Sequence, residues 1–252
     1  MRPTTSLGLG QRCWPKVVSH EALLLVPVGS VEQHGPHLPL STDAMIANAV
    51  TRAAAERLDR GGTTVLVAPT VNYGASGEHE GFPGTVSIGH EALLLLLTEL
   101  GRSAARWARG VIFVNGHGGN TATLTKVVEL LRYEGRPVAW TSTALPDADA
   151  HAGDTETSLL RHLAPWAVRV DLMSAGTTEP VTDLMPRLRA EGVRAVSASG
   201  VLGDPTASSP EKGGVLFERL VANLVAELVT LDVSANGRLS GAGRTRQPLG
   251  AP

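Results

Sequence analysis

The sequence predicts a three-layer α/β sandwich built on a mostly parallel sheet, and two observations favour this fold class. Continuous apolar runs of strand length recur along the chain, as in strands that are buried on both faces. Between these runs, apolar residues recur at helical spacing. Strands and helices therefore alternate, which is typical of folds in which helices cover both faces of a parallel sheet.

Each expected element follows from one of these patterns. Residues 23–28 form the first apolar run, which Gly29 ends, and residues 65–68 and 111–114 repeat it; a fourth strand is predicted near residues 138–141. Four apolar stripes predict helices: Ile46, Val50, Ala54 and Leu58; then Leu93, Leu97, Leu100, Ala104 and Trp107; then Leu124, Val127, Val128 and Leu131; and finally Val215, Leu216, Leu220, Leu224, Val225 and Leu228.

The length of 252 residues is within the range of one α/β domain. We expect this domain to span residues 20–232. Residues 1–19 are predicted to be a flexible N-terminal segment. Residues 233–252 are rich in Gly, Arg, Ser and Pro, and we predict that this tail is disordered.

Composition argues against several classes of partner. A net charge of −2 gives no basic surface for nucleic acid or an anionic membrane. The longest apolar run, residues 92–97, is too short to cross a bilayer, and the first ten residues lack the apolar stretch of a secretory signal. The single cysteine, Cys13, rules out a disulfide within one chain. We therefore expect a cytoplasmic protein that acts on a small molecule or a peptide.

Potential metal ligands follow the first predicted strand. Glu32 and His34 are two residues apart, so an extended backbone places both side chains on one side. Asp43 comes shortly afterwards, just before the helix expected to begin at about Ala44. For Asp43 alone, a helix N-cap competes with a metal ligand.

Two further acid and histidine groups occur later in the chain. His117 has glycines on both sides and directly follows a predicted strand, which lets its ring approach a ligand closely. His151 and Glu156 form the second group, and Glu156 would lie near the start of a helix, where a capping role competes with metal binding. His37 and His79 stay outside this set, because a hydrogen bond that fixes a loop, or contact with substrate, explains them equally well.

Together these residues predict a metal centre. In open α/β sheets, ligands bind beyond the carboxyl ends of the strands, where these loops lie. Carboxylates and imidazoles suit zinc, manganese or iron. Two cations about 3.5–4 Å apart can lower the pKa of a bound water toward about 7. The six side chains are Glu32, His34, Asp43, His117, His151 and Glu156.

Several segments resemble the creatininase family. The longest match covers residues 28–43, which read VGSVEQHGPHLPLSTD, and FPGT at residues 82–85 follows in the family order. NGH at residues 115–117 and HAG at residues 151–153, followed by ETS at residues 156–158, complete the resemblance. It extends over about residues 20–230 and implies a hydrolase of C–N amide bonds with two divalent metal ions per subunit.

The resemblance also implies roles for individual residues. Residues matching Glu32, His34, Asp43 and His117 bind metal in the family, and the aspartate bridges the two ions. Creatinine-cleaving members add a glutamate where this chain has Gly119. We therefore predict that Glu156 replaces the missing ligand and contributes to catalysis. His151 matches a family histidine that relays protons, and we assign it acid and base work on the leaving amine.

The resemblance narrows the substrate as well. Creatinine enzymes carry a tryptophan shortly before the histidine that matches His151, whereas residues 146–150 here read PDADA. The chain is more similar to a peptidase branch that releases a C-terminal, Val-Tyr-derived dipeptide from a modified precursor peptide during redox-cofactor biosynthesis. Such a peptide is the expected substrate, and we expect a homo-oligomer, as is common in the family.

Two alternatives stay open. One is another amidohydrolase of the same family, either a cyclic amide hydrolase or a formamide deformylase of flavin and deazaflavin biosynthesis. A phosphate-bearing substrate would need nearby cationic side chains, and residues 61–101 contain no Lys or Arg. The other is a non-catalytic module that has lost its metals, which the intact set of ligand-type residues argues against.

Overall fold

The computed structural model describes residues 7–240 and 247–249, and its centre is a parallel sheet of four strands in the order β2-β1-β3-β4. This arrangement confirms the predicted fold class. The strands are β1 (Leu23–Val28), β2 (Val65–Val67), β3 (Gly110–Asn115) and β4 (Val138–Ser142). A short antiparallel pair, β5 (Asp232–Val233) and β6 (Gln247–Pro248), follows near the end of the chain.

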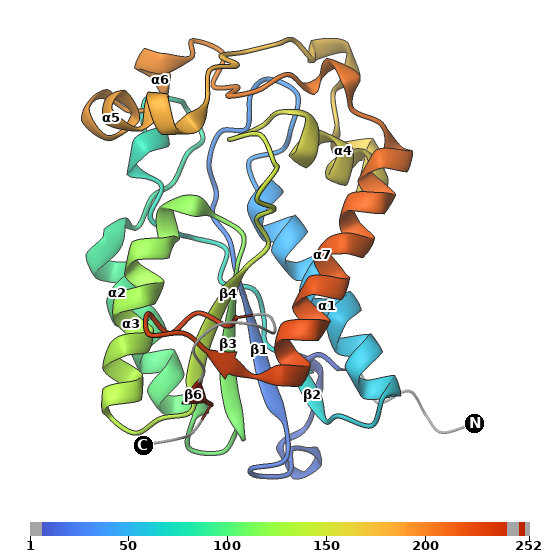
Figure 1. Ribbon diagram of the computed structural model, residues 1–252, viewed down its shortest axis with the longest axis vertical. Coiled ribbons are helices and arrows are strands. Elements are labelled where there is room, and N and C mark those ends of the chain that lie inside the picture. The colour runs from blue at the N-terminus through green and yellow to red at the C-terminus, as the bar shows by residue number, and fades with distance from the viewer. Residues whose placement is uncertain (1–6, 241–246, 250–252) are drawn as a thin grey trace.

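Helices cover both faces of the sheet (Figure 1). One layer holds α1 (Thr42–Arg60), α4 (Asp154–Leu163) and α7 (Pro210–Thr230), and the other holds α2 (Gly89–Ala104) and α3 (Thr121–Tyr133). Two shorter helices, α5 (Val181–Glu191) and α6 (Val193–Val196), lie at the upper end of the view in Figure 1. Within the described residues, no helix is both long enough and apolar enough to span a membrane.

Short 3-10 helices occupy several of the connections. They are η1 (Leu9–Gln11), η2 (Trp14–Lys16), η3 (Gly77–His79), η4 (Gly118–Asn120), η5 (Pro165–Ala167), η6 (Val170–Leu172) and η7 (Pro205–Ala207). Two of them, η3 and η4, lie in the loops that follow β2 and β3, and so they help to shape the carboxyl edge of the sheet.

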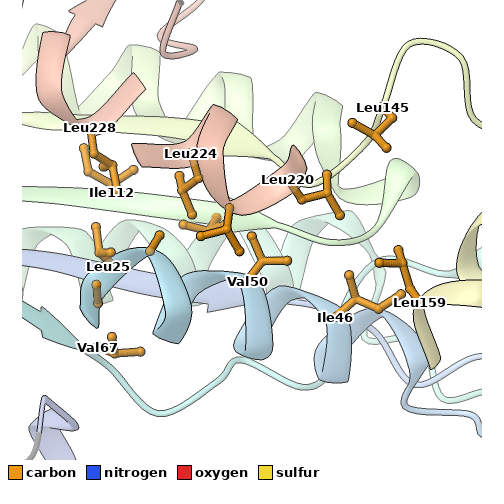
Figure 2. Close-up of a cluster of buried hydrophobic side chains, with 14 of the residues drawn as sticks. Leu25, Ile46, Val50, Val67, Ile112, Leu145, Leu159, Leu220, Leu224 and Leu228 are labelled. Atoms are coloured by element: carbon orange, nitrogen blue, oxygen red, sulfur yellow. The ribbon is translucent and has the colours of Figure 1, made fainter. Parts of the chain in front are cut away.

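Alternate residues of each strand face opposite layers, which explains why the strand sequences are apolar throughout. In β1, Leu25 packs toward α1 and α7, whereas Leu24 and Val26 pack toward α2 and α3. Figure 2 shows the first of these cores, where Leu25 and Ile112 of the sheet lie near helix residues such as Val50 and Leu224. Burying a side chain of this size contributes about 1.5–3 kcal/mol, so the two cores hold the sheet in place.

Part of the predicted tail is ordered. Residues 234–240 turn back onto β4, where the indole of Trp140 donates to the carbonyl of Asn236 (3.1 Å) and Leu239 is buried. The prediction of disorder missed these contacts, because a polar composition does not reveal that one buried leucine anchors the segment. Of the N-terminal segment, Leu7 accepts a hydrogen bond from the amide of Val67. The remaining positions, 1–6, 241–246 and 250–252, lie outside the described residues, and the domain bounds stay a prediction.

The strand register brings the carboxyl ends of three strands to one edge. Val28 of β1 pairs with Asn115 of β3, which pairs with Ser142 of β4. The loops after these strands, together with the loop after β2, gather at the upper end of the molecule in Figure 1. These are the loops that carry the predicted ligands.

Candidate metal centre

The six predicted ligand-type side chains lie together at this edge. Their nitrogen and oxygen atoms fall into overlapping groups of three, each of whose members lie within 4.8 Å of one another. The groups are Glu32, Asp43 and His117; His34, His151 and Glu156; and Glu32, His79 and His151. The third group includes His79, which the sequence prediction had kept outside the metal set.

The first group has the spacing expected around a single cation. His117 Nδ1 lies 3.1 Å from Glu32 Oε2 and 3.2 Å from Asp43 Oδ2. Two atoms bonded to zinc at about 2.1 Å in a tetrahedral arrangement would be about 3.4 Å apart, which is close to these distances. Gly116 makes the approach possible, because a Cβ there would lie 2.6 Å from the carbonyl oxygen of Asp43.

Asp43 also lies beside the second group, of which it is not itself a member. His34 Nε2 lies 3.0 Å from Asp43 Oδ1 and 3.9 Å from Glu156 Oε2. The rings of His34 and His151 are 4.3 Å apart between centroids. Asp43 therefore presents one oxygen to each group, which is the geometry of a bridging carboxylate.

Glu32 provides the clearest sign that a cation fits here. Its side chain is completely buried, and neither carboxylate oxygen makes a well-aligned hydrogen bond, although His117 Nδ1 lies 3.1 Å from Oε2 and His79 Nε2 lies 3.3 Å from Oε1. An uncompensated buried carboxylate is costly, and buried charges in proteins are paired or coordinate metals. A divalent cation beside Glu32 Oε2 would supply the missing partner, so the residues present fit the group.

Burial and the close contact of carboxylates with histidines also shift the pKa values of these side chains. Burial would lower the pKa of His34, but the charge of Asp43 and a hydrogen bond to it outweigh burial and raise this pKa to about 10. Burial would raise the pKa of Glu32, but the neighbouring charge of His117 outweighs it and lowers the pKa to about 2. Burial raises the pKa of Glu156 to about 7. Histidine protons thus balance the buried carboxylates where cations would otherwise do so.

The structure bears on both capping alternatives. Asp43 lies in the first turn of α1, but the helix has no side-chain cap, and Asp43 Oδ2 instead accepts a hydrogen bond from Ser30 (2.5 Å). Glu156 has both kinds of contact. Its Oε2 accepts a hydrogen bond from the backbone N–H of Ala152 (2.6 Å), next to the start of α4, and it also lies near His34. The helix start therefore holds Glu156 in position at the edge of the cluster.

His37 and His79 have different surroundings. His37 Nε2 lies 2.9 Å from the hydroxyl of Thr157, which joins the loop after β1 to α4, as a residue that fixes a loop would. His79 Nε2 lies 3.3 Å from Glu32 Oε1, at the centre of the cluster. Contact with substrate was one of the two roles expected for His79, but the sequence gave no indication of its contact with Glu32.

Sequence reasoning also missed Glu78 and Gln33. Glu78 Oε1 lies 3.4 Å from His117 Nε2, behind the ring nitrogen that faces the cluster. The amide of Gln33 lies between the rings of His79 and His151. Only the folded chain brings these groups together, and the one available signal for Gln33 was its place between Glu32 and His34.

A cavity of about 530 Å³ lies beyond the segment that carries His151. Asp149, Thr178, Leu202 and Lys212 are among its lining residues, but none of the six predicted ligand-type residues lines it. The cavity therefore does not hold the reacting groups, and we assign the chemistry to the buried cluster.

Comparisons with known proteins agree with the fold and the cluster. Residues 11–228 match the family described as creatininase, creatinine amidohydrolase. A mycofactocin precursor peptide peptidase of Mycolicibacterium smegmatis is 51% identical over 92% of this chain and 95% of its own length. A 2-amino-5-formylamino-6-ribosylaminopyrimidin-4(3H)-one 5'-monophosphate deformylase of Methanobrevibacter ruminantium is 30% identical over 55% of this chain and 58% of its own length.

Solved structures of creatininases have the same fold as this chain. A mutant creatininase of the Zn-Zn type has a TM-score of 0.74 at 27% identity, covering 88% of this chain and 96% of its own. A manganese creatininase has a TM-score of 0.73 at 28% identity, covering 87% and 96%. Fold and site together define a hydrolase of amide bonds. The chain belongs to the creatininase family.

Proposed function

We propose that this protein is a metal-dependent peptidase that releases a C-terminal, Val-Tyr-derived dipeptide from the modified mycofactocin precursor peptide. The similarity to the Mycolicibacterium smegmatis peptidase, which extends over nearly the full length of both chains, carries this proposal. The deformylase alternative is not favoured, because the deformylase relatives are 28–30% identical to this chain and the peptidase is 51% identical. The proposal retains a cytoplasmic location and a homo-oligomeric assembly as expectations from the sequence.

We assign the ligands with Asp43 as the shared carboxylate. Glu32, Asp43 and His117 form one of the close groups and would hold one divalent cation. His34 and Glu156, together with the second oxygen of Asp43, would hold the other. Zinc, manganese and iron all suit such donors. When bound, the cations would polarise the carbonyl of the scissile amide and make water a stronger nucleophile at neutral pH.

The protein groups then position the substrate and move the proton. His151 donates from Nε2 to the backbone carbonyl of Gln33 (2.8 Å), so its Nδ1 faces the cluster without a proton. Burial lowers the pKa of His151 well below its ordinary value, so the ring is neutral at pH 7. His151 would take a proton from the attacking water and deliver it to the departing nitrogen of the peptide.

The test is cleavage of the modified precursor peptide. The metal-loaded protein is incubated with the peptide, with and without chelator, and the products are followed by mass spectrometry. We expect loss of the C-terminal dipeptide only when metal is present. Cleavage that chelator does not affect would refute the metal dependence.

Two controls test the choice of substrate and the role of His151 independently. The unmodified precursor tests whether the modification is recognised, and His151→Gln tests the proton relay while leaving the five proposed ligands, Glu32, His34, Asp43, His117 and Glu156, in place. A protein that binds two equivalents of metal but leaves the modified peptide whole would refute the peptidase assignment and direct the search to formamides and cyclic amides.

A further inference from the structure

Four histidine rings surround Glu32 and Asp43, and three of them are held in the same way. In each of the three, the nitrogen facing away from the cluster donates to a backbone carbonyl, so the nitrogen facing the cluster is available to a cation. These bonds are His34 Nδ1 to Glu32 O (3.1 Å), His117 Nε2 to Ala75 O (3.1 Å) and His151 Nε2 to Gln33 O (2.8 Å).

His79 is the exception, and the reason is the side chain of Gln33. The backbone N–H of Gly35 donates to Gln33 Oε1 (2.9 Å), which fixes the oxygen and nitrogen ends of the amide. The other end is therefore the NH₂ group. It lies 2.9 Å from His79 Nδ1, 3.0 Å from His151 Nε2 and 3.2 Å from the carbonyl oxygen of Gly200. His151 Nε2 itself donates to the backbone carbonyl of Gln33 and so cannot accept, which leaves the two N–H bonds to His79 Nδ1 and Gly200.

This arrangement determines which nitrogen of His79 carries the proton. An NH₂ group has only donors, so His79 Nδ1 must accept from Gln33 and cannot itself bear a proton. The proton of the neutral ring is therefore on Nε2. That nitrogen faces the cluster, 3.3 Å from Glu32 Oε1.

We propose that His79 is the hydrogen-bond donor of the metal centre and not one of its ligands, and that Gln33 is the positioning residue that holds it in this role. The inference rests on the proposed function only in taking the cluster to be a metal centre. Although Glu32, His79 and His151 are close enough to form a third site, the proton on His79 Nε2 stands where a cation would have to bind.

The two carboxylate oxygens of Glu32 then have different neighbours. Its Oε1 faces the N–H of His79, and its Oε2 faces His117 and Asp43. A donor on Oε1 would leave Oε2 as the atom that binds the cation. His79 would thus orient the Glu32 carboxylate without binding metal itself.

A distant part of the chain supports this arrangement. Gly200 has a positive φ of 81°, and a Cβ at this position would overlap the amide of Gln33. Glycine at position 200 therefore lets the backbone close over Gln33 and accept its second N–H. The amide is bonded at both ends, to Gly35 and to Gly200, so its NH₂ group stays directed at His79.

The tautomer can be measured directly. In ¹⁵N-labelled protein, long-range ¹H–¹⁵N correlation spectra show which ring nitrogen carries the proton, in the metal-free and the zinc-loaded protein alike. We expect His79 to have a protonated Nε2 and an unprotonated Nδ1 in both states. Assignment comes from His79→Gln, which removes one ring, with His90→Gln as the control for a histidine that contacts Thr123 instead.

Two results would overturn the proposal. One is a proton on His79 Nδ1; the other is the loss of the Nε2 proton when zinc is added, which would make His79 a ligand. Neither depends on peptide cleavage, so a failure of the proposed substrate would leave this measurement valid.

Variants provide a second test. Glutamine can place an N–H near the position of His79 Nε2, so His79→Gln should retain two equivalents of metal. His79→Met has no donor and should weaken metal binding by about 10- to 100-fold. Loss of a full metal equivalent in His79→Gln, with the fold intact by circular dichroism, would identify His79 as a ligand and refute the proposal.

Discussion

The carboxylate of Glu78 lies against the backbone of Gly119, and a Cβ added at Gly119 would come within 2.6 Å of Glu78 Oε1. The resemblance to creatinine-cleaving enzymes implies that they carry a glutamate at the position of Gly119. In this chain that space is taken by a side chain from the loop after β2, which also faces His117 Nε2. A carboxylate behind a ligating histidine orients its ring and raises its basicity.

Gly119→Ala should therefore reduce metal binding, because the new methyl group would overlap the His117 ring and lie 2.5 Å from the carbonyl oxygen of Ala75. The backbone carbonyl cannot move aside, so His117 should shift. We expect a loss of about 10-fold or more in metal affinity, measured by competition with a chelating dye. Gly118→Ala is the matched control, since a Cβ there meets nothing within 4 Å. Equal affinities in the two variants would contradict the prediction.

Asp43→Asn should remove metal from both groups, because Asp43 presents one oxygen to each. The substitution keeps the shape of the side chain but removes the charge that both cations would share. We expect metal content, measured by elemental analysis, to fall well below one equivalent and activity to fall with it. Asp59→Asn, on the exposed end of the same helix, should retain both. One fully retained equivalent in Asp43→Asn would argue against a bridging role.

Metal affinity should decrease as the pH falls. The pKa of His34 is raised to about 10 and that of His117 well above its ordinary value, because Asp43 and Glu32 outweigh the effect of burial. Both rings therefore carry an additional proton at neutral pH, and a cation must displace it. Calorimetry at pH 7 in buffers of different ionisation enthalpy should show protons released on metal binding. Identical heats in all buffers would contradict this.

Leu25→Ala should destabilise the metal-free protein by about 2–5 kcal/mol, because the leucine fills the core between β1 and the helices α1 and α7. Denaturant unfolding followed by circular dichroism measures the change. Leu95→Ala, on a helix surface where the side chain is 63% exposed, should change the free energy of unfolding by less than about 0.5 kcal/mol. Similar effects for the two variants would show that the described core is wrong.

Much of the fold could be predicted because the strands are buried on both faces. A run such as LLLVPV has no polar face, so it has few alternatives to a covered parallel strand. Helix positions followed from apolar stripes in the same way. The ordered turn at residues 234–240 was missed, because it depends on Trp140 and Leu239, which are far apart in the sequence.

The part of the site whose residues are close in sequence could be predicted. Glu32, His34 and Asp43 belong to one loop and helix start, and they lie together in the structure as expected. The contacts of His79 and Glu78 could not be foreseen, because a histidine or a glutamate in a loop has no periodic pattern. Their positions depend on how the loop after β2 packs against the loops after β1 and β3.

The contact between Gly200 and Gln33 joins residues that are 167 positions apart. During synthesis, the loops bearing Glu32, Asp43 and His117 emerge from the ribosome long before Gly200 exists. Until then, the second N–H of the Gln33 amide does not have the carbonyl of Gly200 as its acceptor. We therefore expect the nascent chain to acquire its hydrolytic centre late, after most of the sheet has formed, so that a partly made enzyme is unable to cut peptides in the cell.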